Sequence, residues 1–267
     1  MTKRPLVMGV INVTPDSFSD GGFLANPESA ARRAVDMAAQ GADWLDVGGE
    51  STRPGAMPVA ETEELARVVP AIAAIRARCG LPVSVDTMKP AVARAAVAAG
   101  ATMWNDVTAL TSAPESLETA AALNCYVALM HMQGRPGTMQ DSPRYNDVVA
   151  EVTEFLAGRA RAAMAAGVAR GRIWLDPGLG FGKTLAHNLA LLRGLEQIVA
   201  LGFPVMIGAS RKGMFRAIDP AATQASDRLG GSIAVAIAAA RAGVAMVRVH
   251  DVRETVQALT VERAIHG

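Results

Sequence analysis

Short runs of apolar, often β-branched residues alternate along the chain with longer Ala-rich stretches whose apolar positions recur at helical spacing. This alternation predicts repeated strand–helix units, and therefore a parallel sheet covered by helices. We count eight units, with strands expected at residues 6–13, 44–47, 83–86, 103–106, 126–130, 173–176, 205–208 and 246–250. Eight units favour an α/β fold of the closed (β/α)8 (TIM) barrel type, with an open doubly wound sheet as the alternative.

The predicted helices begin and end at recognisable residues. Asn26 and Pro27 supply an N-cap and a proline in the first helical turn, and Gly41 follows the end of the same helix. Left-handed C-terminal caps are expected in the same way at Gly80, Gly100, Gly167 and Gly243. Pro70 interrupts another apolar helical stripe, so we expect it to kink or split that helix.

Length and composition fit one enzyme-sized domain over residues 1–267. Hydrophobic residues form 51% of the chain, enough to cover both faces of a parallel sheet, and the net charge of +1 gives no field that would attract nucleic acid. No apolar segment reaches the length of a membrane span or of a secretory signal. The two cysteines, Cys79 and Cys125, have no metal-ligand spacing, which fits a reducing compartment and a cytoplasmic protein.

Several predicted strands end on a carboxylate or an amide, and a barrel would gather these ends around one cavity. The side chains in question belong to Asn12, Asp46, Asp86, Asn105, Asp106 and Asp176. A single aspartate of this kind is usually a loop cap, whereas the whole set indicates a pocket that forms hydrogen bonds with a ligand. Neighbouring residues of a strand face opposite ways, so we expect Asn105 rather than Asp106 to point inward. Asp46 is the weakest member of the set.

Cationic and titratable side chains follow the seventh and eighth predicted strands, where phosphate sites of this fold commonly lie. Lys212 is in the loop after strand seven, while Arg248 and His250 share one face of strand eight. A guanidinium can bind phosphate or stack on a heterocycle, which favours a functional role for Arg248. Arg211 is equally well explained as a solvated loop charge.

Three further segments carry candidate chemistry or packing. Residues 176–184 look like a phosphate loop, but Pro177 occupies the place of the first glycine, so we interpret the glycines as allowing close backbone approach to a flat ligand. Phe181 would form an aromatic wall there, or ordinary core. The loops 12–22 and 48–55 are expected to close over an anion, with Asp16 and Arg53 either paired together or turned to the ligand. The three tryptophans, Trp44, Trp104 and Trp174, are expected to pack the barrel.

Eight motifs, in order along nearly the whole chain, closely resemble those of the dihydropteroate synthases. They comprise residues 12–20 (NVTPDSFSD), 46–55 (DVGGESTRPG), 84–87 (SVDT), 105–106 (ND), 129–134 (LMHMQG), 176–183 (DPGLGFGK), 210–212 (SRK) and 248–251 (RVHD). The resemblance implies that 6-hydroxymethyl-7,8-dihydropterin diphosphate and 4-aminobenzoate give 7,8-dihydropteroate and diphosphate in folate synthesis. It also implies competition by sulfonamides and a homodimeric assembly.

The resemblance further assigns roles at the matching positions. The residues implied to bind the pterin are Asp86, Asn105, Met130, Asp176, Phe181, Lys212 and Arg248. Those implied to bind the diphosphate are Asn12, Thr52, Arg53, Arg248 and His250, with Asn12 also a ligand of Mg2+. Those implied to bind aminobenzoate are Phe18, Pro54, Lys212 and Gly213, and the catalytic set is Asp16, Arg53, Lys212 and His250. The family often has serine where this chain has Gly213, so one hydroxyl contact to the aminobenzoate carboxylate would be missing.

Other functions remain open from the residues themselves. A pterin-dependent methyltransferase could share the barrel and the pterin pocket, but it would not need the diphosphate-directed Asn12, Asp16, Arg53 and His250. An aldolase would use Lys212 to form a Schiff base, which borohydride would trap. A pterin-binding protein without turnover would bind the pterin diphosphate and release no diphosphate when the amine is added.

Overall fold

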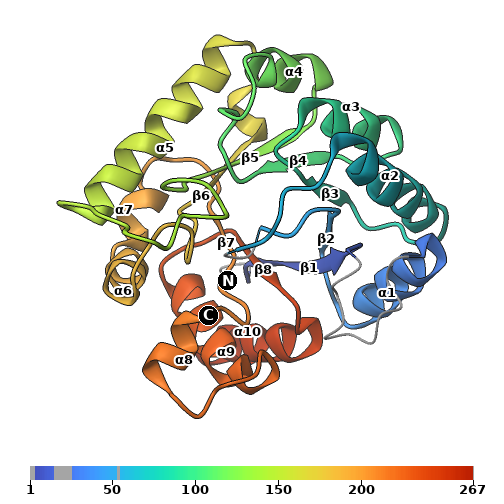
Figure 1. Cartoon of the computed structure of the whole chain (residues 1–267). Helices are drawn as coiled ribbons and strands as arrows, with labels where there is room; N and C mark the ends of the chain where they lie inside the picture. Colours follow the sequence, from blue (N-terminus) through green and yellow to red (C-terminus); the bar gives the residue numbers. More distant parts are fainter. Residues whose placement is uncertain (1–3, 15–25, 53–54, 267) are drawn as a thin grey trace.

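The computed structural model describes residues 4–14, 26–52 and 55–266, and within them eight parallel strands form a closed ring (Figure 1). The strands are β1 (Leu6–Asn12), β2 (Trp44–Gly48), β3 (Val83–Asp86), β4 (Met103–Asp106), β5 (Tyr126–Met130), β6 (Ile173–Asp176), β7 (Met206–Ile207) and β8 (Met246–Val249). Each strand pairs with its neighbour in sequence, β8 pairs with β1, and a bridge between Leu175 and Val205 joins β6 to β7. The closed order confirms the (β/α)8 barrel and excludes the open doubly wound sheet.

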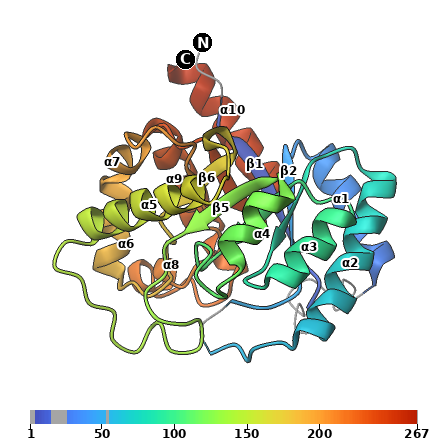
Figure 2. The ribbon, with the colours of Figure 1, turned by 90° about the horizontal axis from the view of Figure 1, so that it is seen from above.

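Helices surround the strands as an outer layer, which Figures 1 and 2 show from two directions. They are α1 (Pro27–Ala39), α2 (Glu61–Arg78), α3 (Pro90–Ala98), α4 (Ser116–Leu123), α5 (Val148–Ala165), α6 (Leu185–Arg193), α7 (Leu195–Val199), α8 (Met214–Ile218), α9 (Leu229–Arg241) and α10 (Val252–His266). None of those helices combines the length and apolar character that crossing a membrane requires.

The helix boundaries confirm most of the predicted caps. Asn26 Oδ1 accepts a hydrogen bond from Glu28 N at the start of α1, and Gly41 follows with a left-handed φ of 94°. Gly80 is an exception: α2 ends at Arg78, its C-cap Cys79 is extended, and Gly80 has no left-handed φ. Pro70 does not split α2: it lies on the exposed side of the helix, while buried residues on either side keep the two halves packed on the barrel.

The alternation of side chains along the strands divides the core into two layers. A large outer layer between strands and helices contains the aliphatic side chains of both. A smaller inner layer fills the barrel with Met8, Met103, Ala128, Trp174, Met206 and Met246, against which Trp44 packs. Trp104 is the exception among the tryptophans, because it belongs to the outer layer and donates from Nε1 to the Thr87 carbonyl at 2.8 Å. The inner layer closes the barrel below its carboxyl end.

Candidate active site

The strand register brings the predicted polar residues into one layer at the carboxyl end of the barrel. Asn12 lies beside Gly48, Gly48 beside Asp86, and Asp86 beside Asn105. Gly48 lies in this layer between the two side chains: a Cβ there would meet Asn12 Oδ1 at 3.7 Å and the Cβ of Asp86 at 3.6 Å, both ordinary contact distances. Three polar side chains, from β1, β3 and β4, therefore face the same interior space.

Arg248 is the centre of a buried charge network in that space. Its Nε donates to Asp46 Oδ2 at 2.6 Å, and its Nη2 donates to Asp86 Oδ2 at 2.9 Å. Asn105 Nδ2 reaches the same Asp46 oxygen at 3.3 Å. Asp106 faces the other way and accepts from the backbone N–H groups of Thr108 and Leu110, as the alternation along β4 predicts. Two carboxylates thus fix the plane of the Arg248 guanidinium.

Burial sets the charge states of this network. It raises the pKa of Asp86 to about 7, although the positive charge of Arg248 opposes the shift and Asp46 adds to it. The pKa of Arg248 is raised above its usual range, because the attraction of Asp46 and Asp86 outweighs desolvation. Near neutral pH the site therefore holds a permanent guanidinium cation beside a carboxyl group that can gain or lose a proton.

Asp176 and Lys212 lie next to this network, because Lys212 interacts with Asp176, Arg248 and Asp86. Asp176 ends β6 beside Met130 of β5, and its Oδ1 accepts from Gly178 N at 2.7 Å. Burial raises the pKa of Asp176, while its bond to Gly178 and the charge of Lys212 oppose the shift. Burial also lowers the pKa of Lys212 to about 8, against the attraction of Asp176. The Lys212 ammonium lies 4.0 Å from the centroid of the Phe181 ring, which makes Phe181 a wall of the site rather than core.

Two of the glycines between β6 and α6 allow a close approach to a neighbouring loop, while the predicted approach of this backbone to a flat ligand stays a prediction. A Cβ on Gly178, whose φ is 66°, would lie 2.0 Å from the His131 carbonyl oxygen. A Cβ on Gly182, whose φ is 61°, would lie 2.4 Å from the Gln133 carbonyl oxygen. The loop can therefore pack against the β5–α5 loop only with glycine at these positions.

The residues after β7 and β8 meet as predicted. The Oγ atom of Ser210 lies 3.1 Å from the backbone nitrogen of His250 and 3.1 Å from its Nδ1. Ser210 was not singled out as a site residue from the sequence. Arg211 is not a solvated loop charge, because it forms two hydrogen bonds with the Asp251 carboxylate. Gly213 is exposed and precedes the five-residue helix α8.

Some predicted site residues lie outside the described residues or apart from the charge network. Asp16, Phe18, Arg53 and Pro54 fall outside the described ranges, so their predicted roles stay predictions. Thr52 is half-buried in the β2–α2 loop. That loop is anchored by a cluster that was not predicted from the sequence, in which Lys89 bridges the carboxylates of Glu50 and Glu64.

A metal site formed by the protein alone is absent from the described residues, where no three His, Cys, Asp or Glu side chains gather suitably. The amide oxygen of Asn12 still fits Mg2+, which prefers oxygen ligands and usually keeps several waters and substrate phosphates around it. Asn12 ends β1 at the open end of the barrel. The residues present therefore fit an ion that arrives with a phosphorylated substrate.

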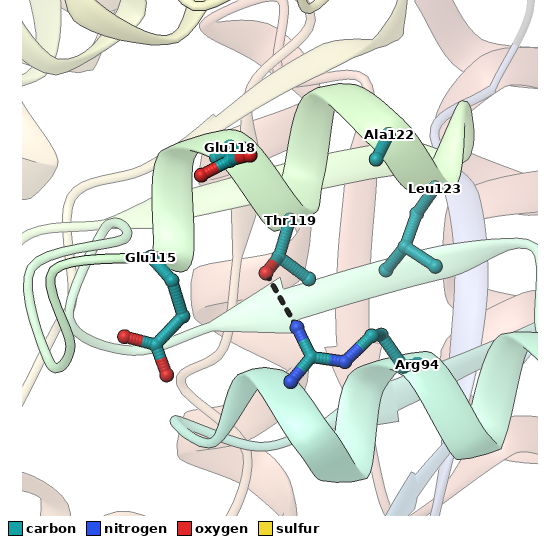
Figure 3. Close-up of a pocket in the computed structure, with 6 residues that line it drawn as sticks. All are labelled: Arg94, Glu115, Glu118, Thr119, Ala122 and Leu123. Carbon is teal, nitrogen blue, oxygen red and sulfur yellow. Dashed lines mark hydrogen bonds between the residues drawn. The ribbon is translucent and has the colours of Figure 1, made fainter.

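A surface cavity of about 310 Å3 lies elsewhere, between α3 and α4 (Figure 3). Arg94 of α3 crosses it and donates to Thr119 Oγ1 of α4 at 2.7 Å. Its lining comes from these two helices of the outer layer and includes none of the strand-end residues. The cavity is therefore separate from the site inside the barrel.

Comparison with known proteins agrees with this geometry. The model of the pterin binding enzyme family matches residues 8–250. The chain is 47% identical to the dihydropteroate synthase of Escherichia coli (strain K12) over 262 residues, which cover 98% of this chain and 92% of that protein. It is 45% identical to the dihydropteroate synthase of Neisseria meningitidis serogroup C over 265 residues, covering 98% and 93% of the two chains.

Solved structures show the same likeness in three dimensions. The Yersinia pestis dihydropteroate synthase with a sulfonamide drug superposes with a TM-score of 0.94 at 45% identity, covering 98% of this chain and 94% of that one. The Xanthomonas albilineans enzyme in complex with 7,8-dihydropteroate gives a TM-score of 0.89 at 46% identity, covering 100% and 96%. Fold and site together define a pterin-binding (β/α)8-barrel enzyme. Within that class, the chain belongs to the dihydropteroate synthase family.

Proposed function

We propose that this site condenses 6-hydroxymethyl-7,8-dihydropterin diphosphate with 4-aminobenzoate, giving 7,8-dihydropteroate and diphosphate for folate synthesis. One observation carries the proposal: buried polar side chains from β3, β4, β6 and β8 gather at the carboxyl end of the barrel, where Lys212 and Arg248 each interact with both Asp86 and Asp176. The solved Xanthomonas albilineans relative in complex with 7,8-dihydropteroate supports the same substrate class here.

The pterin would bind between Asp176 and Lys212. A pterin presents an amidine-like edge with two donors, which a carboxylate such as Asp176 can accept as paired hydrogen bonds. The ammonium of Lys212 suits the carbonyl and ring-nitrogen acceptors of the pterin. Phe181 and Met130 would line the ring, and Asp86 with Asn105 would bind its remaining polar edge. The fixed plane of Arg248 would allow stacking on the ring.

The diphosphate would lie over the open end of the barrel, held by Asn12, Thr52, Arg248 and His250 and closed over by Asp16 and Arg53. Mg2+, when bound through Asn12 and the diphosphate, would neutralise charge on the leaving group. The chain's own cations act in the same way, because positively charged groups favour departure of diphosphate from the ring-conjugated methylene carbon. The amine then forms the new C–N bond and loses a proton, so no covalent enzyme intermediate is required.

The 4-aminobenzoate would approach between the early loops and the start of α8, beside Phe18, Pro54, Lys212 and Gly213. Gly213 offers no hydroxyl to the carboxylate, so this chain would rely on Lys212 and backbone N–H groups there. Sulfonamides would compete for the same position, as the drug complex of the Yersinia pestis relative suggests.

We further propose a homodimer in the cytoplasm. The unpaired, buried thiols of Cys79 and Cys125 are consistent with a reducing compartment. The dimer is inferred from family resemblance alone. Sedimentation of the purified protein, measured at several concentrations by analytical ultracentrifugation, would check it. A monomer at working enzyme concentrations would contradict it.

The direct test incubates the purified protein with Mg2+, the pterin diphosphate and 4-aminobenzoate, and follows dihydropteroate and diphosphate. A protein that binds the pterin diphosphate and releases no diphosphate with amine would be a non-catalytic binder. Asp176→Ala should abolish pterin binding, whereas Asn12→Ala and Arg53→Ala should slow turnover more than they weaken binding. Unchanged pterin affinity in Asp176→Ala would contradict the site assignment.

A further inference from the structure

Lys183 is buried beside the pterin pocket, and the proposed chemistry does not use it. Its side chain belongs to the β6–α6 loop and is only 3% exposed. The Nζ atom lies 2.9 Å from the Phe181 carbonyl oxygen, 3.3 Å from the His131 carbonyl oxygen and 2.9 Å from His131 Nδ1. One amine therefore joins the loops that follow β5 and β6.

The charge states of this pair agree with a role in holding the backbone. Burial lowers the pKa of His131 to about 3, and the charge of Lys183 adds to the shift, so the imidazole is neutral and its Nδ1 accepts. Burial also lowers the pKa of Lys183 to about 7, with Asp176 opposing the shift and Lys212 adding to it. Charged or neutral, the amine still has hydrogens to donate to the two carbonyl groups.

The backbone around Phe181 needs such an anchor. Gly180 and Gly182 flank Phe181, and both have positive φ, of 81° and 61°. Glycine is free to adopt many other conformations, so local sterics alone do not fix the direction of the Phe181 side chain. Lys183 holds the Phe181 carbonyl, while the Tyr145 hydroxyl donates to the Gly182 carbonyl at 2.8 Å. The Phe181 N–H also donates to the Gly178 carbonyl at 3.1 Å, and Lys183 is the side chain that holds the Phe181 carbonyl.

We propose that Lys183 is a positioning residue for the pterin: by tying the Phe181 carbonyl to His131, it holds the Phe181 ring against Lys212. The inference rests on the proposed function, because it assigns Lys183 a part in forming the pterin pocket. It predicts that removing the amine weakens pterin binding through Phe181. Lys183 does not touch the substrate in this scheme.

The test is a double-mutant cycle on the affinity for pterin diphosphate, measured by calorimetry with the full chain. Lys183→Met and Phe181→Ala should each weaken binding about tenfold, and the double variant should be little weaker than either, because both remove the same placed ring. The KM for 4-aminobenzoate should change less than the pterin affinity. Tyr145→Phe is the matched control, since it removes a neighbouring anchor of the same loop and should change pterin affinity by less than about twofold.

Two results would overturn the inference: wild-type pterin affinity in Lys183→Met, or losses that multiply in the double variant. If Lys183→Met does not fold, Lys183→Leu, which also lacks a donor, replaces it in the same cycle, with the same expected coupling and the same contrary results. Failure of the wild-type chain to bind pterin diphosphate would instead contradict the proposed function. The two failures are therefore distinguishable by the wild-type titration alone.

Discussion

At the scale of single residues, the site depends on how its buried charges hold one another. Asp46 shows this best, because it is fully buried and binds both Arg248 and Asn105 through Oδ2, while its Oδ1 has no hydrogen-bond partner among the described residues. A charged group removed from water is tolerated when its partners satisfy it, and removing one partner leaves the others uncompensated. Asp46 therefore acts on the pterin through the side chains that it orients.

Asp46→Asn should consequently weaken pterin binding about tenfold and lower the free energy of unfolding by roughly 1–3 kcal/mol. The amide keeps the volume of the carboxylate but loses the charge that Arg248 faces. Asp251→Asn is the control, because it removes the partly exposed pair with Arg211 and should cost less than about 1 kcal/mol with pterin affinity unchanged. Calorimetry and urea unfolding give both quantities, and wild-type pterin binding by Asp46→Asn would show that Arg248 needs no such support.

The lowered pKa of Lys212 predicts that the free energy of unfolding and the pterin affinity change with pH in opposite directions. Its pKa in the folded chain is about 8, below the ordinary lysine value of 10.5, so the unfolded chain binds more protons between these pH values. The free energy of unfolding should therefore rise with pH across this window, by roughly 2–3 kcal/mol relative to Lys212→Met. Pterin affinity should fall over the same window, because the neutral amine attracts the pterin acceptors less strongly. Urea unfolding and pterin titrations at pH 7 and 10 check both, and a constant stability difference between the two proteins would refute the assignment.

At the scale of elements, the β2–α2 loop that carries Thr52 is held from outside the barrel. Glu50 Oε1 accepts from Val59 N at 3.1 Å, and Arg67 Nη1 donates to the Gly49 carbonyl at 2.8 Å. Lys89, which directly precedes α3, adds a bridge from Glu50 to Glu64 of α2. The loop is thereby tied to α2 and to the residue that precedes α3.

Lys89→Met should lower the free energy of unfolding by roughly 3–5 kcal/mol near pH 8, because it leaves Glu64 buried without its cation. Burial already raises the pKa of Glu64 above its ordinary value of 4.5, while Lys89 opposes that shift. Without Lys89 the pKa of Glu64 in the folded chain rises further, so at pH values above 4.5 the folded chain binds more protons than the unfolded chain. The loss of free energy of unfolding should therefore be smaller at pH 5 than at pH 8. Turnover should also fall, because the loop that carries Thr52 loses its bridge from Glu50 to Glu64.

The double variant Lys89→Met/Glu64→Gln is the matched control for this prediction. It removes the buried charge together with its partner, so part of the lost stability should return and the difference between pH 5 and pH 8 should shrink. Urea unfolding at the two pH values measures the effect. Equal losses at both pH values in Lys89→Met would show that Glu64 does not carry the destabilising charge.

At the scale of the whole molecule, the sequence predicts the repeated strand–helix units but not the contacts between side chains from distant segments. The apolar pattern locates all eight strands. The alternation of side-chain direction along a strand correctly predicts that Asn105 points inward and Asp106 outward. Strand β7 is shorter than its pattern, because a strand lasts only as far as its neighbours pair with it. Pairing of Asp46 with Arg248, and of Lys183 with His131, is invisible in the sequence because local periodicity does not report contacts between distant segments.

Ring closure leads to the last prediction, that the chain unfolds as one cooperative domain. The pterin site draws on β3, β4, β6 and β8 and on Lys212, so only an intact barrel can bind the ligand. Pterin diphosphate at 100 times its Kd should add about 2.7 kcal/mol to the free energy of unfolding. For a chain of this size, that corresponds to a rise in Tm of roughly 5–10 °C.

Tryptophan fluorescence and far-ultraviolet circular dichroism should report the same transition with and without ligand, because tryptophans lie both inside the barrel and under its helices. Separate transitions, of which the ligand shifts only one, would divide the chain into more than one unit.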